Sequence, residues 1–93
     1  MRFFRRASKP ARLYTRHPCP LCDRLVSDLE RARLRPRLEL ERIDVDLDPE
    51  LSRRFGASVP VLEVDGTILV RGVWSLPELE RRYAALCQEA PSC

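Results

Sequence analysis

The 93-residue sequence has no long apolar run, and this absence sets the first limits on what the protein can be. No stretch approaches the roughly 20 apolar residues that cross a bilayer, so the sequence predicts no membrane-spanning helix. The basic start, MRFFRRASKPAR, also lacks the apolar stretch and the small-residue cleavage site of a secretory signal peptide. We therefore expect a protein of the cytoplasm that does not bind membranes.

Aromatic residues are also few, with three Phe, two Tyr and one Trp, and the basic residues are unevenly placed. Residues 1–12 contain five of the 17 Lys and Arg residues and no acid, so the 14 acidic residues slightly outnumber the bases in the remaining chain. That remainder has no basic stripe interleaved with aromatic residues, which argues against a nucleic-acid-binding surface. We expect residues 1–11 to be a flexible basic extension and residues 12–93 to form one small, monomeric domain.

Apolar periodicity predicts a series of strands and helices in this domain. The expected elements are a strand over 12–15, a helix over 20–34, a strand over 38–46 with a bulge near Arg42, a short helix over 48–56, a hairpin over 59–70 and a helix over 75–90. Asp48 is placed to cap the short helix, and Asp65-Gly66 is a hairpin turn signal. Ser75 and Glu78 have the spacing of a capping box.

The predicted order β-α-β-α-β-β-α defines an α/β fold. A helix between the first two strands requires that they run parallel with a right-handed crossover, whereas the Asp-Gly turn makes the last two antiparallel. We therefore predict a four-stranded mixed sheet with helices on both faces.

The four cysteines lie at positions 19, 22, 87 and 93. In a reducing compartment, a Cys-x-x-Cys pair near a βαβ pattern indicates a redox centre, with metal binding as the competing interpretation. A zinc site needs four ligands, and here an unusual set of His17, both pair cysteines and either Cys87 or Cys93 would have to supply them. Cys87 lies on the apolar stripe of the last predicted helix, where a buried and inert thiol is expected.

Pro20 fits the first position of a helix, so Cys19 should precede the helix and Cys22 should lie in its first turn. The free N–H groups of that turn, with Arg16 nearby, should then lower the pKa of the Cys19 thiol and favour its thiolate. Cys22 should face inward. We therefore predict that Cys19 is the nucleophile and that Cys22 resolves the mixed disulfide.

The predicted topology and three segments resemble the glutaredoxin-like proteins of the thioredoxin-fold superfamily. LYTRHPCPLC matches the first strand with its basic residue and Cys-Pro-x-Cys motif, ASVPVLEVDG matches the loop with a cis proline, and RGVWSLPEL matches the glycine-containing segment before the last helix. The chain departs from the best-studied members at two places. Leu21 replaces an aromatic residue, and Gly72 is followed by Val73 rather than by a second glycine and an acid.

This resemblance implies a thiol–disulfide oxidoreductase that reduces protein disulfides or mixed disulfides with glutathione. It implies a cis bond between Val59 and Pro60 beside the cysteine pair, and Val59 and Pro60 would then contact the substrate. The implied glutathione contacts are Arg16 at one carboxylate, and Gly72, Val73 and Ser75 at the γ-glutamyl part.

No tightly bound cofactor or metal is implied, and glutathione is the expected co-substrate. Electrons would come from glutathione or from a donor of the thioredoxin-reductase type. The alternative is a thioredoxin-fold binding module, or a domain in which Cys19 and glutathione hold an iron–sulfur cluster without efficient disulfide exchange.

Overall fold

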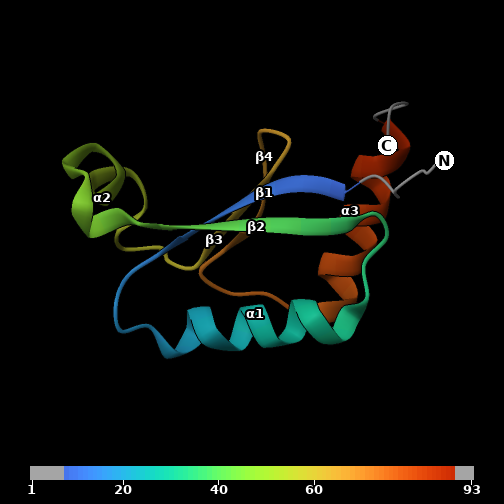
Figure 1. Cartoon of the computed structure of the whole chain (residues 1–93), viewed down its shortest axis with the longest axis horizontal. Coiled ribbons are helices and arrows are strands. Elements are labelled where there is room, and N and C mark those ends of the chain that lie inside the picture. Colours follow the sequence, from blue (N-terminus) through green and yellow to red (C-terminus); the bar gives the residue numbers. More distant parts are fainter. Residues whose placement is uncertain (1–7, 90–93) are drawn as a thin grey trace, which may run out of the picture.

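Four strands and three α-helices follow one another in the order β-α-β-α-β-β-α in the computed structural model, which describes residues 8–89 (Figure 1). The elements are β1 (Ser8–Thr15), α1 (Pro20–Ala32), β2 (Arg37–Asp44), the short 3-10 helix η1 (Val45–Leu47), α2 (Pro49–Phe55), β3 (Val61–Val64), β4 (Thr67–Arg71) and α3 (Leu76–Glu89). The sheet order is β2-β1-β3-β4. β1 runs parallel to β2 and antiparallel to β3, and β3 pairs antiparallel with β4. The predicted α/β fold and mixed sheet are confirmed.

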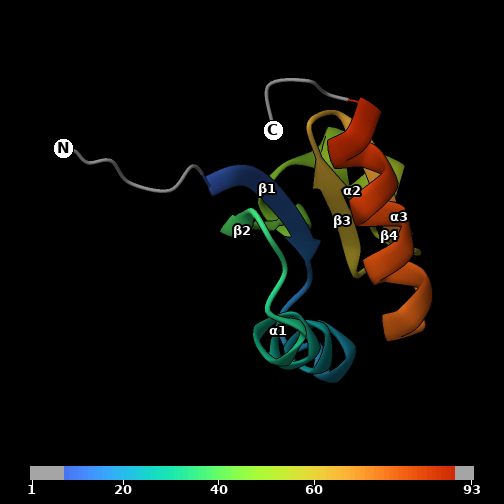
Figure 2. The same ribbon diagram turned by 90° about the vertical axis from the view of Figure 1, so that its right-hand side faces the viewer.

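Each face of the sheet is covered by different helices. On one face, Leu13 of β1 and Leu62 of β3 pack with Leu25 of α1 and Tyr83 of α3 in the larger buried cluster. Figure 2, in which α1 is seen end-on, shows both helices beside the strands. On the other face, a smaller cluster joins the sheet to α2, as its members Tyr14, Val45, Phe55 and Val61 show. None of the helices within residues 8–89 has the length and apolar character needed to cross a bilayer.

Local signals in the sequence set several element boundaries. The Asp48 side chain caps α2 by accepting a hydrogen bond from the Glu50 backbone N–H at 2.9 Å. Asp65 and Gly66 form the β3–β4 turn with φ values of 53° and 79°, a conformation that Gly adopts without steric cost. Ser75 Oγ accepts from the Glu78 backbone N–H at 3.4 Å at the start of α3. These features confirm the Asp48 cap, the hairpin turn and the Ser75 half of the predicted capping box.

The first strand begins earlier than the predicted residue 12, because β1 starts at Ser8. Residues 8–11 pair in parallel with Arg37–Leu40 of β2, and Lys9 and Ala11 are buried in alternation with exposed neighbours. A buried lysine and a strand proline conceal this alternation in the sequence. Lys9 forms an ion pair with Asp65 at 2.7 Å, and Pro10 lies where β1 has no β3 partner. The rest of the predicted extension, residues 1–7, lies outside the described residues.

The predicted bulge near Arg42 is also wrong, since β2 pairs with β1 in an unbroken register. Its apolar residues change phase because they reach opposite faces of the sheet. Leu38 and Leu40 pack against the larger cluster, whereas Ile43 packs against the smaller cluster beside α2. The irregularity of this sheet lies between β3 and β4, at Leu62 and Glu63.

Candidate active site

Cys19 is the N-cap residue of α1. Its backbone is extended, with φ −144° and ψ 95°, and its sulfur accepts a hydrogen bond from the Cys22 backbone N–H at 3.2 Å. The first N–H groups of a helix have no partner within the helix, so they are available to a group placed before it. Pro20 occupies the first helical position, where its missing N–H costs no hydrogen bond. The Cys19 sulfur therefore lies at the positive end of α1.

Cys22 is joined to Cys19 by a disulfide, with the two Cα atoms 5.2 Å apart. The two residues differ in access to solvent, because Cys22 is only 1% exposed whereas Cys19 is half-buried. An incoming thiol can therefore reach Cys19 more readily than Cys22. This asymmetry is what disulfide exchange requires of an attacking cysteine and a resolving cysteine.

Pro60 lies directly before β3 and is fully buried. The Val59–Pro60 peptide bond is cis, and the bonds before Pro18 and Pro36 are cis as well. The Pro60 carbonyl accepts a hydrogen bond from the Gly72 backbone N–H at 2.8 Å. This bond ties the proline loop to the segment that follows β4.

A groove of about 350 Å³ joins the cysteine helix to the segment between β4 and α3. Leu21, between the two cysteines, is 46% exposed in this groove, and Val73 is 84% exposed on the opposite wall. Gly72 has a φ of 83°, and an added Cβ would approach the Ser58 carbonyl oxygen to 3.3 Å. The structure thus brings Gly72, Val73 and Ser75 together beside the Cys-x-x-Cys motif.

Arg16, the predicted contact for a glutathione carboxylate, is already engaged within the chain. Its Nε lies 3.1 Å from both carboxylate oxygens of Asp46, and its Nη1 donates to the Gly56 carbonyl at 3.0 Å. Gly56 permits this approach, since an added Cβ would lie 2.7 Å from Arg16 Nη2. The Arg16 side chain is 41% exposed and links the residue after β1 to η1 and to the C-terminal end of α2, and it does not line the groove.

Asp28, an acid that α1 contributes to the groove, is not among the site residues predicted from the sequence. Its carboxylate accepts from Trp74 Nε1 at 3.0 Å and pairs with Arg31 Nη2 at 2.8 Å, and its side chain is 15% exposed. The Trp74 hydrogen bond, and then the Arg31 hydrogen bond, lower the pKa of Asp28. Asp28 lies seven residues after Leu21, which places the two residues on the same face of the helix. This spacing is the signal in the sequence that could have indicated a place for Asp28 in the groove.

Protonation of Asp28 is expected to change the fluorescence of Trp74, the one tryptophan of the chain. The folded-state pKa of Asp28 is lowered from its ordinary 3.8, so its stabilising contacts are fully present above pH 3.8 and are lost as the pH falls through the lowered value. We expect the emission to be constant down to about pH 4 and to change below it. An Asp28→Asn variant should lack this step, with circular dichroism reporting any unfolding. An identical step in both proteins would contradict the assignment.

Among residues 8–89, no group of three His, Cys, Asp or Glu side chains is placed to hold a metal ion. His17 is exposed, and Cys87 is half-buried on α3 beside the larger cluster. Cys93, which completes one conceivable metal-ligand set, lies outside the described residues.

The fold is that of the thioredoxin-like proteins, and the disulfide-linked pair at a helix start is consistent with a redox function. The chain belongs to the glutaredoxin-like family, because the model of the Glutaredoxin-like domain (DUF836) matches residues 11–89. A crystal structure of the structural genomics target XcR50 from X. campestris is 30% identical, with a TM-score of 0.71, and the match covers 81% of this chain and 96% of that one.

A solution structure of reduced desulfothioredoxin from Desulfovibrio vulgaris Hildenborough is also similar to the chain. It is 26% identical with a TM-score of 0.59, and the match covers 85% of this chain and 82% of that one. No curated protein sequence matches the chain significantly.

Proposed function

We propose that the protein is a thiol–disulfide oxidoreductase that reduces protein disulfides or glutathione-mixed disulfides through Cys19 and Cys22. The observation that carries this proposal is the difference in access between the two sulfurs. The half-buried residue Cys19 caps the helix, and its disulfide partner Cys22 is only 1% exposed. The decisive experiment replaces each cysteine separately by serine and measures the reduction of both substrate types.

In the proposed reaction, the Cys19 thiolate attacks one sulfur of the substrate disulfide. That S–S bond breaks, a mixed disulfide forms, and the leaving sulfur departs as a thiolate that takes up a proton. Cys22 then loses its proton and attacks the Cys19 sulfur, which releases the second substrate sulfur as a thiolate. Two electrons pass from the pair to the substrate, leaving the Cys19–Cys22 disulfide.

A thiol donor must then reduce the Cys19–Cys22 disulfide, with either glutathione or a donor of the thioredoxin-reductase type in this role. We place the reaction in the cytoplasm, where such donors keep thiols reduced. The protein would act there as a monomer without a tightly bound cofactor.

The remaining predicted site residues would position the substrate. An extended substrate segment would pair with the backbone at Val59 and Pro60, in the manner of an added strand. Gly72, Val73 and Ser75 line the groove beside Leu21 and would contact the part of the substrate that extends from its disulfide.

Asp46 should weaken the recognition of glutathione by competing for Arg16. A glutathione carboxylate that binds Arg16 must displace the Asp46 carboxylate, which lies 3.0 Å from Arg16 Nη2. An exposed ion pair contributes up to about 1 kcal/mol, so an Asp46→Asn variant should lower the KM for a glutathionylated substrate about two- to fivefold. The kcat should be unchanged, because Asp46 does not take part in the exchange itself.

The matched control is Glu50→Gln, which removes a neighbouring exposed acid that pairs with Arg53 rather than with Arg16. The KM for a protein disulfide substrate should stay constant in both variants. An unchanged or higher KM for the glutathionylated substrate in the Asp46 variant would show that Arg16 does not bind that carboxylate.

A further inference from the structure

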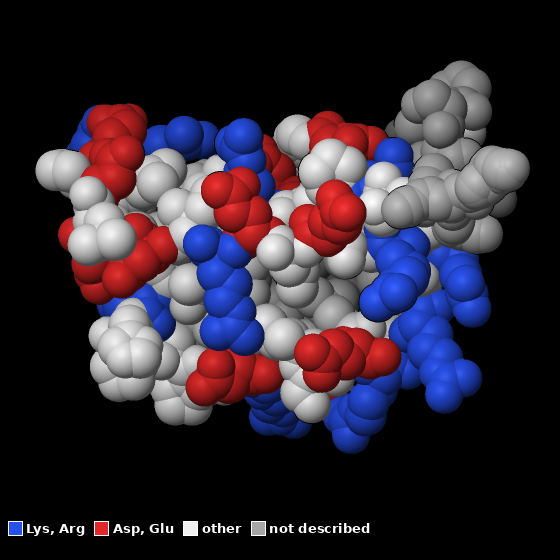
Figure 3. Space-filling view, in the orientation of Figure 1, with Lys and Arg blue, Asp and Glu red and all other residues white. Residues whose placement is uncertain are grey.

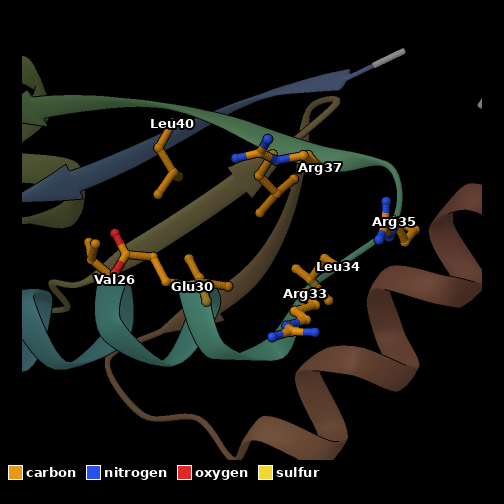
Figure 4. Close-up of a pocket in the computed structure, with 9 residues that line it drawn as sticks. Val26, Glu30, Arg33, Leu34, Arg35, Arg37 and Leu40 are labelled. Carbon is orange, nitrogen blue, oxygen red and sulfur yellow. The ribbon is translucent and has the colours of Figure 1, made fainter. Parts of the chain in front are cut away.

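A second groove lies between the C-terminal half of α1 and the first half of β2 (Figure 4). It has a volume of about 650 Å³ and shares no lining residue with the groove beside the cysteines. Leu40 points from β2 toward α1, and Val26 and Glu30 point from α1 toward β2. We call this site the α1–β2 groove, and its lining consists of Val26, Leu29, Glu30, Arg33, Leu34, Arg35, Arg37, Leu38 and Leu40.

The α1–β2 groove adjoins a free edge of the sheet. β2 is an outer strand, and β1 is its only strand partner within residues 8–89. The outer backbone N–H and C=O groups of an edge strand can pair with another chain. The groove and the edge therefore form one continuous surface, with side-chain contacts on the α1 side and backbone groups along β2.

Charge divides this surface into two zones. Arg33, Arg35 and Arg37 lie at the turn from α1 into β2, and no salt bridge joins them to an acidic side chain within residues 8–89. Figure 3 shows basic side chains gathered at the right of the view, where this turn lies. Farther along β2, Glu39 and Glu41 are exposed on the face opposite the groove.

We propose that the edge of β2 binds an extended segment of a partner protein as an added strand. Because side chains alternate between the faces of a strand, one face of that segment would carry apolar residues that enter the groove beside Leu38 and Leu40. Its other face would carry basic residues opposite Glu39 and Glu41. An acidic residue would follow at the end that meets Arg37.

A second copy of this chain fits this edge poorly in the registers that pair the middle of β2. A register centred on Leu38 would set Glu39 opposite Arg37, but it would pair only residues 37–39 of β2. Symmetric antiparallel pairing of two β2 strands centred on Leu40 would set Glu39 of each copy opposite Glu41 of the other. Pairing centred on either glutamate would set that residue opposite itself. Like charges directly opposite each other destabilise a strand pair, so the edge favours a partner of complementary charge.

Nuclear magnetic resonance titration of the full chain with two short peptides tests this proposal. The first peptide, acetylated and amidated Lys-Leu-Lys-Leu-Glu, has the proposed pattern, and the second, Glu-Leu-Glu-Leu-Lys, has its charges exchanged. The first should shift the resonances of residues 37–44 and of the end of α1. It should also bind about fivefold more tightly than the second, because three cross-strand charge pairs change sign, those with Glu39, Glu41 and Arg37.

A Glu39→Lys, Glu41→Lys double variant should reverse this preference without change in disulfide exchange, since neither residue lies near the cysteine groove. A first peptide with serine in place of leucine should bind much more weakly. The proposal would be overturned by equal affinity for both peptides, by an unreversed preference in the double variant, by dimerisation through β2, or by binding to anionic phospholipid vesicles alone. None of these outcomes depends on the proposed redox activity.

Discussion

Replacement of Cys19 by serine is expected to abolish the reduction of both a protein disulfide and a glutathionylated substrate. The Cys19 sulfur caps α1 and lies at the positive end of the helix, where the proposed attack begins. A serine hydroxyl at the same position cannot form a disulfide, so the rate should fall by on the order of a thousandfold or more, to the background level. Coupled assays of both reductions under the same donor measure this loss.

The Cys22→Ser variant should behave differently, because Cys19 can still attack. With a protein disulfide, it should accumulate a mixed disulfide that mass spectrometry detects as a covalent adduct at Cys19. With a glutathionylated substrate, added glutathione can take over the resolving role, so part of the activity should persist.

A Cys87→Ser variant is the matched control, since Cys87 is a half-buried thiol on α3 outside the pair. It should retain both activities. Substantial activity in the Cys19→Ser variant would assign the attack to another thiol and refute the proposed roles. Loss of both activities in the Cys87 variant, with its fold intact by circular dichroism, would have the same consequence.

Replacement of Leu25 by alanine should destabilise the protein strongly. Leu25 is completely buried and joins α1 to the larger cluster, where it packs with side chains of β1, β3 and α3. Truncation of a buried leucine removes apolar contacts and leaves a cavity, which typically costs about 2–5 kcal/mol. This is a large part of the roughly 5–15 kcal/mol that stabilises a typical domain. Urea unfolding followed by circular dichroism measures the free energy of unfolding.

The matched control for this variant is Leu21→Ala on the same helix. Leu21 is 46% exposed, so its truncation should cost about 1 kcal/mol or less. Equal losses in the two variants would indicate that α1 does not rest on the sheet through Leu25.

Most of the fold could be predicted because its signals are local. Pro20 begins α1, Asp48 caps α2, and Asp65-Gly66 forms the turn of the hairpin. The start of β1 could not be predicted in this way, since the burial of Lys9 depends on a partner 56 residues away. An ion pair of that separation leaves no periodic pattern in the sequence.

In the candidate site, too, local features could be predicted and contacts between distant residues could not. The Cys19–Cys22 spacing and the helix start are local, so the sequence predicted their arrangement. The engagement of Arg16 by Asp46 joins residues 30 positions apart, and the Asp28–Trp74 hydrogen bond joins residues 46 apart. Such contacts depend on how β1, η1, α1 and the segment before α3 pack, which residue spacing alone does not specify.

The burial of Cys22 has a consequence for the timing of the proposed catalytic cycle. If only the Cys19 sulfur can be reached, the thiol donor and the disulfide substrate must both react at that one atom. They cannot both occupy the protein at once, so turnover takes the form of two alternating half-reactions. Selectivity for the donor and for the substrate must then arise from the surface around Cys19. Leu21 and Val73 are exposed there to both molecules in turn.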